Sequence, residues 1–176
     1  KILKKFRDKK NEQNIWLAFT PIKQNPLNFI IQKGTELGVQ KFIPILSERT
    51  IVKDINIERI KKIIIESVEQ SNRISVPKIT KPETLKNFIS SFPQKGCLIF
   101  CDINSDEINL KNIVKKKDLG PVCILIGPEG DFSENERKFI IDLKQSYSIS
   151  LAKNILRAET AAVAALTLVN YHLNLS

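Results

Sequence analysis

The sequence predicts an α/β protein built on a largely parallel β-sheet. Short apolar runs rich in Ile, Val and Phe alternate along the chain with longer stretches whose apolar residues recur every three or four positions. The first pattern is typical of buried strands and the second of amphipathic helices, and strands that alternate with helices usually form parallel sheets. A chain of 176 residues has the size of one ordinary domain. We therefore expect one domain with helices on both faces of its sheet.

The N-terminal half contains signals for helix ends. Gly38 follows an apolar helical stripe, and glycine readily takes the left-handed conformation that ends a helix. Thr84 caps a later stripe, and Pro93 ends that stripe because proline cannot continue a helix. The expected elements are a strand at 15–19, a loop at 21–26, a helix at 27–37, a strand at 42–46, a helix at 57–68 and a helix at 85–92.

The C-terminal half contains a signal for a helix start and ends in a strongly helical segment. Ser133 and Glu136 form a capping box, in which each side chain bonds to the backbone N–H of the other residue. The expected elements are a strand at 97–101, a loop with a short helix at 104–119, a strand at 122–126, a helix through 139–143, a strand at 149–151 and a helix at 160–173.

A glycine-bounded loop, 127–130, directly follows the apolar strand at 122–126. Such a loop exposes backbone amides beside a strand end, where α/β proteins usually hold small ligands. A Gly-Pro-Glu-Gly turn between a strand and a helix also needs no ligand to explain it. The loop alone therefore leaves a binding site and a structural turn as equal alternatives.

The chain is strongly basic, with 28 Lys and Arg against 19 Asp and Glu and a formal net charge of +9. This charge favours a polyanionic partner such as nucleic acid, because cations near phosphates release condensed counterions. Basic residues cluster within 4–10 and again at 115–117, and we interpret the second cluster as a solvated segment. The glycine-rich dinucleotide motif and the Walker motif are both absent from the sequence, which argues against those cofactors.

The cysteines and the single histidine exclude several kinds of site. Cys97, Cys101 and Cys123 lie in apolar surroundings and suggest buried reduced thiols, which predicts a cytoplasmic protein. His172 is the only histidine, so no histidine-rich metal centre is possible, and we expect no bound metal. No apolar run approaches the roughly 20 residues of a membrane span, so no membrane contact is expected. The sequence begins at Lys1 and contains no methionine, so we expect an N-terminal part to be missing.

Segments 31–39, 69–77 and 151–161, together with the loop 127–130, carry a family resemblance. In this order they resemble the SPOUT-superfamily enzymes that use S-adenosylmethionine to methylate N3 of a uridine in bacterial 16S ribosomal RNA. The resemblance runs from about residue 15 to 173, and ordered motifs are far more specific than any one alone. It implies a SPOUT-type domain with a deep trefoil knot, in which the C-terminal segment passes through a loop of the chain.

The resemblance also implies an organisation and partners. Residues 15–176 form the methyltransferase domain, and residues 1–14 are the tail of a missing N-terminal, PUA-like RNA-binding domain or a linker. The family's enzymes are homodimers that act on 16S ribosomal RNA or the small ribosomal subunit. Dimer contacts between the first and last helices would use small residues that permit close approach, Ala161, Ala162, Ala164 and Ala165.

By the same resemblance, a pocket for S-adenosylmethionine is formed by the glycine loop and the segment after the last strand. Ordinary core packing is the alternative for its apolar members. Asp131 and Ala152 stand where the family usually has glycine, which bears on cofactor affinity. If position 131 needs a positive φ, aspartate tolerates it less well than glycine. The expected pocket residues are Leu125, Gly127, Pro128, Glu129, Gly130, Leu151, Ile155 and Leu156.

Arg157 is the predicted catalytic residue. Attack by uridine N3 requires loss of a proton or stabilisation of negative charge on the flanking carbonyl oxygens, and a guanidinium suits the second task. The alternative is an ion pair with Glu159 or Glu129. The general base stays unassigned.

Two further arginines, Arg49 and Arg73, are expected to contact RNA, and a buried structural network with Glu36 is the alternative for them.

Two other functions of the protein are also open. One is a non-catalytic RNA-binding or ribosome-assembly protein on the same fold. The other is a SPOUT methyltransferase with a different RNA target.

Overall fold

A computed structural model of the chain describes residues 13–105, 110, 113 and 120–174. Its strands form a seven-stranded sheet in the order β3-β2-β1-β6-β5-β7, with β4 paired to the end of β2. Every one of these pairings is parallel, as the sequence predicted. The strands are β1 Ile15–Phe19, β2 Val39–Leu46, β3 Lys78–Ile79, β4 Glu83–Thr84, β5 Cys97–Cys101, β6 Val122–Ile126 and β7 Ser146–Ile149.

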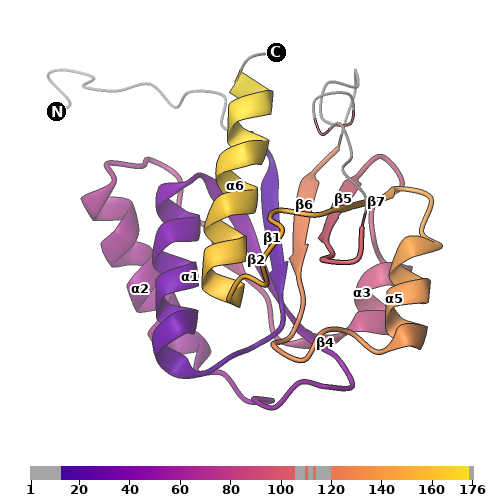
Figure 1. The fold of residues 1–176 in the computed structure, drawn as a ribbon. Helices are drawn as coiled ribbons and strands as arrows, with labels where there is room; N and C mark the ends of the chain where they lie inside the picture. The colour runs from indigo at the N-terminus through magenta and orange to yellow at the C-terminus, as the bar shows by residue number, and fades with distance from the viewer. Residues whose placement is uncertain (1–12, 106–109, 111–112, 114–119, 175–176) are drawn as a thin grey trace, which may run out of the picture.

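The helices cover both faces of the sheet (Figure 1). One hydrophobic cluster joins the sheet to α1, α2 and α6, and a second joins its other face to α3 and α5. These helices are α1 Gln24–Glu36, α2 Ile57–Gln70, α3 Leu85–Ser90, α5 Glu134–Ile141 and α6 Ala158–Asn174. The predicted layer arrangement is therefore confirmed, while the predicted trefoil knot stays a prediction.

Alternation along the strands assigns each side chain to one face. In β6, Ile124 lies in the cluster with α1 and α6, while its neighbours Cys123 and Leu125 lie in the other cluster. The cysteines are free thiols, and burial raises the pKa of Cys101 to about 12. Burial also raises the pKa of Cys123 well above its usual value, so both thiols stay protonated at neutral pH.

Several predicted boundaries were wrong. The first helix begins at Gln24, inside the predicted loop 21–26, because Pro26 lies in the first turn and removes no helical hydrogen bond there. The predicted strand 149–151 is β7, which ends at Ile149. Its polar Ser146 and Ser148 hid it from a search for apolar runs. The strands β3 and β4 are only two residues long and were missed. Most of the predicted loop 104–119 and nearly all of the segment 1–14 lie outside the described residues.

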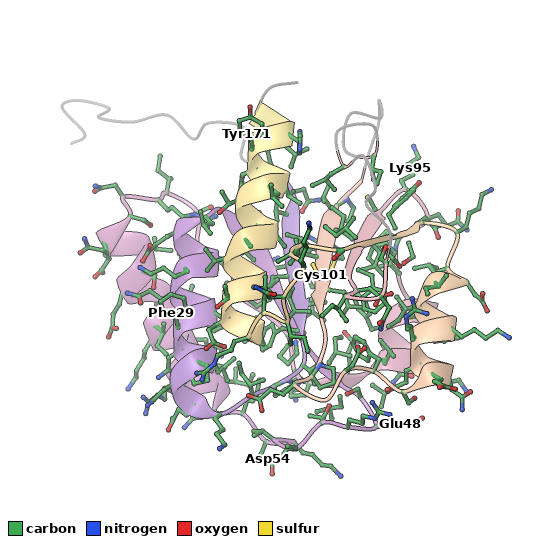
Figure 2. All side chains as sticks on the ribbon, in the orientation of Figure 1. Phe29, Glu48, Asp54, Lys95, Cys101 and Tyr171 are labelled. Atoms are coloured by element: carbon green, nitrogen blue, oxygen red, sulfur yellow. The ribbon has the colours of Figure 1, made fainter. Side chains whose placement is uncertain are left out.

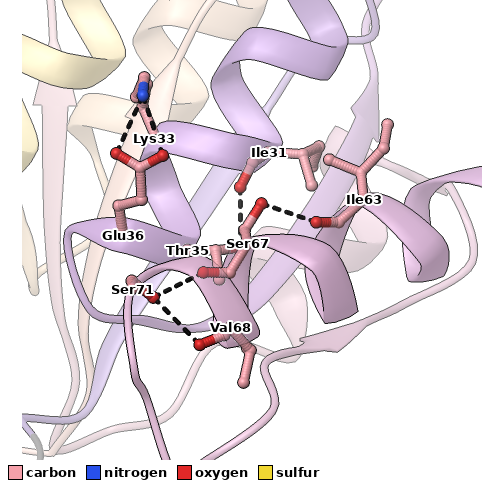
Figure 3. A network of polar contacts seen from close by, with 8 residues as sticks. All are labelled: Ile31, Lys33, Thr35, Glu36, Ile63, Ser67, Val68 and Ser71. Carbon is pink, nitrogen blue, oxygen red and sulfur yellow. Dashed lines mark hydrogen bonds and ion pairs between the residues drawn. The ribbon is translucent and has the colours of Figure 1, made fainter.

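The helices α1 and α2 contact each other, and small polar side chains on both have hydroxyl groups that are satisfied within their own helix (Figure 3). Thr35 Oγ1 donates to the carbonyl oxygen of Ile31 at 2.8 Å, and Ser67 Oγ donates to that of Ile63 at 2.6 Å. Both residues are buried, so these bonds remove the cost of an unpaired hydroxyl. Glu36 pairs with Lys33 at 2.9 Å.

At Gly34, α1 approaches the sheet closely. A Cβ atom at Gly34 would lie 2.8 Å from Cε1 of Phe42, whose ring is fully buried and has little room to move. Overpacking of this kind costs about 1–3 kcal/mol, which exceeds the roughly 1 kcal/mol by which alanine favours a helix over glycine.

We therefore expect Gly34→Ala to lower the free energy of unfolding in urea. Gln32→Ala, on the exposed side of the same helix, is the matched control and should leave the stability unchanged or raise it. Equal stability of Gly34→Ala and the parent protein would mean that α1 can move away from the sheet without cost.

Candidate functional site

The loops after β1, β2 and β6 meet at one edge of the sheet. The parallel register places Phe19 of β1 beside Pro44 of β2 and beside Ile126 of β6, so the three strands end close together. The backbone N–H of Thr20 donates to the carbonyl oxygen of Ile126 at 3.1 Å, which ties the first loop to the third. This edge carries Glu48 and Asp54 at the bottom of the molecule in Figure 2. The carboxyl edge at a change of strand order is where open α/β sheets bind ligands, and β1 lies at that change here.

The helix that follows the glycine loop begins with the predicted capping box. Glu136 N–H donates to Ser133 Oγ, and Glu136 Oε2 accepts from Ser133 N–H at 3.1 Å. The second carboxylate oxygen, Oε1, accepts from the backbone N–H of Glu48 at 2.8 Å. One side chain therefore caps α5 and also attaches the loop after β2 to it.

Arg49 is placed against the glycine loop. Its Nη1 donates to the carbonyl oxygen of Gly130 at 2.7 Å. Both residues line a pocket with an empty volume of about 390 Å³, part of it open to solvent. The RNA contact predicted for Arg49 stays a prediction. The pocket is lined by Pro21, Ile22, Lys23, Arg49, Ile51, Val52, Pro128, Glu129 and Gly130.

Asp131 has a φ of 60°, as the sequence analysis had considered for this position. Its backbone N–H donates to the carbonyl oxygen of Pro128, and its Oδ1 accepts from the N–H of Phe132 at 2.8 Å. The Phe132 ring packs so closely on Gly127 that a Cβ there would lie 3.0 Å from it. Aspartate therefore supports the loop conformation that glycine usually supplies.

The predicted cofactor residues fall into two segments with different surroundings. Leu125 is fully buried in β6, where core packing accounts for it. Leu151 is only partly buried against the core. Ile155 is 85% exposed, so core packing does not account for it. The segment 151–157 follows β7 and runs across the sheet towards α6 (Figure 1).

Arg157 is exposed and directly precedes α6. Its carbonyl oxygen accepts from the N–H of Ala161 at 2.9 Å, so the residue occupies the start of the helix as predicted. Within the described part of the chain its guanidinium forms no ion pair, so the alternative pairing with Glu129 or Glu159 is absent. The catalytic role stays a prediction.

Arg73 is held in a structural position rather than at the pocket. Its Nη1 donates to the carbonyl oxygens of Thr35 at 2.7 Å and Val39 at 2.9 Å, and its Nη2 donates to Ser75 Oγ at 3.0 Å. These bonds join the end of α1 to the start of β2. They favour the structural alternative, and the RNA contact predicted for Arg73 stays untested.

The predicted dimer contact needs a correction for two of the four small α6 residues, while Ala161 and Ala164 are partly exposed and their role stays a prediction. Ala162 and Ala165 are 1% and 0% exposed and belong to the hydrophobic core of their own chain. Their small size therefore lets α6 approach the sheet and α1. Exposed side chains of α6 that a dimer contact could cover include Leu168 and Tyr171.

An ion pair that was not predicted from the sequence lies at the end of β5. Asp102 follows β5, and its carboxylate is fully buried. Asp102 Oδ2 accepts from Arg137 Nη2 at 2.7 Å and from Nε at 2.9 Å, and Oδ1 accepts from the N–H of Asn104. The hydrogen bond with Asp102 raises the pKa of Arg137, so the guanidinium stays charged. The one sequence feature that could have indicated this pair is the position of an acidic residue, Asp102, directly after a buried strand.

Among residues 13–105, 110, 113 and 120–174, no three His, Cys, Asp or Glu side chains gather as metal ligands would. None of the helices in this part of the chain has the length and apolar character needed to cross a membrane.

Arg137→Ala tests whether the buried pair holds the loop after β5. Removing one partner of a buried ion pair costs about 3–5 kcal/mol, and we expect the lower end because about a third of the Arg137 side chain is exposed. Urea unfolding should therefore show a large loss in the free energy of unfolding for Arg137→Ala. The same quantity should change little for Lys138→Ala, a substitution at the exposed neighbour. If Arg137→Ala lost only a little of this free energy, water would have replaced the guanidinium as the hydrogen-bond donor to Asp102.

Comparisons with known proteins identify the family. Residues 9–170 match the sequence model of a family described as an RNA methyltransferase domain. The chain is 34% identical over 159 residues to ribosomal RNA small subunit methyltransferase E of Rickettsia conorii, and the match covers 90% of this chain and 64% of that protein. The chain thus spans somewhat less than two thirds of that relative.

Solved structures of similar proteins support the same family. A ribosomal RNA small subunit methyltransferase E from Neisseria gonorrhoeae bound to S-adenosyl methionine has a TM-score of 0.79 at 27% identity, covering 90% of this chain and 66% of that one. A SpoU methyltransferase from Streptomyces viridochromogenes, at 18% identity, shares the fold with a TM-score of 0.56 and covers 95% and 63%. The resemblance found in the sequence is confirmed: the chain belongs to the RNA methyltransferase domain family, and its fold is that of the SPOUT methyltransferases.

Proposed function

We propose that the protein transfers a methyl group from S-adenosylmethionine to N3 of a uridine in 16S ribosomal RNA. The observation that carries this proposal is the match of residues 9–170 to the RNA methyltransferase domain family. The names of the Rickettsia and Neisseria relatives supply the ribosomal substrate class, and the Neisseria structure supplies the cofactor. The net charge of +9 suits an RNA partner.

The glycine loop fits the proposed cofactor. A Cβ at Gly130 would meet only Cδ of Arg49, at 3.9 Å, so the backbone there is open to a ligand. Within the described chain, the N–H groups of Glu129 and Gly130 have no hydrogen-bond partner and can donate to an acceptor. When bound, S-adenosylmethionine supplies an electrophilic methyl group. The remaining predicted pocket residues, Leu125, Gly127, Pro128, Leu151, Ile155 and Leu156, belong to this proposal.

Arg157 supplies the electrostatic part of the proposed mechanism. Methyl transfer from a sulfonium needs mainly alignment of the nucleophile with the methyl group. As the N3 proton leaves, negative charge spreads to the carbonyl oxygens of the uracil. The Arg157 guanidinium forms no ion pair with any described residue and lies on the segment that crosses from β7 to α6, so it is available to stabilise that charge.

Further parts of the proposal concern the whole protein. We propose a cytoplasmic homodimer whose contact includes exposed apolar side chains of the adjacent helices α1 and α6, Phe29, Leu168 and Tyr171. Figure 2 labels Phe29 on α1 and Tyr171 on α6. Residues 1–14 then lead to an N-terminal RNA-binding domain. The non-catalytic alternative loses support at Asp131, because aspartate adopts the positive φ without losing the hydrogen bonds of the loop.

Cofactor binding and product mapping test the proposed function together. We expect calorimetry on the full-length protein to detect S-adenosylmethionine binding that is unchanged by a metal chelator. Small subunits from cells that lack the gene should gain one N3-methyluridine when incubated with the protein and cofactor. Absence of binding at millimolar cofactor would contradict the enzyme proposal, and methylation of another nucleotide would correct only its target.

Substitution of Arg157 separates catalysis from folding. Arg157→Ala and Arg157→Lys should leave the affinity for S-adenosylmethionine nearly unchanged, while the methylation rate falls by about a hundredfold or more, the scale for one preorganised donor. Lys153→Ala, an exposed cation in the same segment, is the matched control and should keep its rate. Normal turnover of Arg157→Ala would remove the residue from the mechanism, and a joint loss of melting temperature and cofactor affinity would assign it a structural role.

A further inference from the structure

The pocket at the edge of the sheet combines an apolar wall with two cations. Pro21 and Ile22 are buried at its base. Ile51 lines it from the loop after β2 and is 86% exposed, more than any other large hydrophobic side chain found exposed in the described chain. An apolar side chain this exposed contributes little to the stability of its own chain, and it is free to pack against a ligand in the pocket.

The cations of the pocket, Lys23 and Arg49, are available for an anion. Arg49 is oriented by its bond to the Gly130 carbonyl oxygen, which leaves its other N–H groups unused within the described chain. The ammonium group of Lys23 forms no ion pair with any described residue. Glu129 is the only acidic residue among those that line the pocket, so its lining carries a net positive charge.

This combination matches the chemistry of a nucleotide. A base has an apolar face that packs on aliphatic or aromatic side chains, and each nucleotide of a strand carries a phosphate that lysine and arginine bind. The cofactor matches less well, because its sulfonium is itself a cation. None of the residues 151–157 lines the pocket.

We infer that this pocket is a subsite for one unpaired nucleotide of the RNA substrate, with the base on Ile51 and Pro128 and the phosphate on Lys23 and Arg49. The inference rests on the proposed function for the identity of the RNA. The pocket shares Pro128, Glu129 and Gly130 with the loop proposed to bind the cofactor. A nucleotide in the pocket therefore lies next to the site of methyl transfer.

The test measures binding of small ribosomal subunits to the full-length protein by filter retention, in the presence of S-adenosylhomocysteine, so that no turnover is required. The variants are Lys23→Glu and Ile51→Asp. The matched controls are Lys62→Glu and Ile65→Asp on the exposed side of α2, where Ile65 is 49% exposed and loses more packing than Ile51.

We expect Lys23→Glu and Ile51→Asp each to raise the dissociation constant for subunits about tenfold or more, with controls within twofold. Lys23→Glu should also flatten the dependence of binding on salt, because a phosphate contact is lost. The affinity for S-adenosylmethionine, measured by calorimetry, and the melting temperature should stay unchanged in all four variants. The same two pocket variants should raise KM for subunits more than they lower kcat.

Two outcomes overturn the inference. Unchanged subunit affinity in both pocket variants would show that no nucleotide binds there. Loss of cofactor affinity with normal subunit affinity would assign the pocket to the cofactor. Failure of the proposed function looks different, because the parent protein would then bind subunits without methylating them while the pocket variants still lost binding.

Discussion

Parallel pairing of β1 with both β2 and β6 is the constraint on which the candidate site depends. The pairing puts the carboxyl ends of three strands together, although β1 and β6 are separated by about a hundred residues in the chain. The loops after these strands then have to share one edge of the sheet. The two hydrophobic clusters hold the strands in this register, since a shift by one residue would exchange the side chains of β1 and β6 between the faces. The site is thus a consequence of core packing before any ligand is considered.

The loops gain their shape from side chains that come from other elements. Glu136 of α5 binds the N–H of Glu48, Arg49 binds the carbonyl oxygen of Gly130, and Arg137 of α5 binds Asp102 after β5. Each bond joins the end of one strand to a neighbouring loop or helix. Charge-assisted bonds of this kind are stronger than neutral ones, and they limit the freedom of loops that must present backbone groups to a ligand.

Features that depend on local sequence patterns were predicted, whereas contacts between residues distant in the sequence were missed. The capping box of Ser133 and Glu136 spans four residues, so it was predictable, but the third partner, Glu48, lies 88 residues away from Glu136. The hydrogen bonds of Arg73 were not predictable in the same way, because their acceptors, the carbonyl oxygens of Thr35 and Val39, lie 38 and 34 residues away in the chain. The site residues from the family resemblance lie on β6, on the loop after it and on the segment after β7, and only the fold separates buried Leu125 from exposed Ile155.

The peptide between Gly130 and Asp131 connects the pocket to the glycine loop. Its carbonyl oxygen accepts from Arg49, and its N–H donates to the carbonyl oxygen of Pro128. A planar trans peptide points these two groups in opposite directions, so the two bonds together set the orientation of the peptide plane that precedes Asp131, whose φ is 60°. A ligand phosphate that draws the Arg49 guanidinium towards itself would weaken the hydrogen bond to Gly130. A phosphate bound by the unused N–H groups of Arg49 would instead add charge-assisted hydrogen bonds beside it. Because Arg49 has five N–H donors and uses one on Gly130, the second case needs no rearrangement of the loop. A lysine at this position lacks the planar set of N–H donors that can bind the Gly130 carbonyl oxygen and a phosphate at the same time. This difference is a physical reason for an arginine between the pocket and the loop.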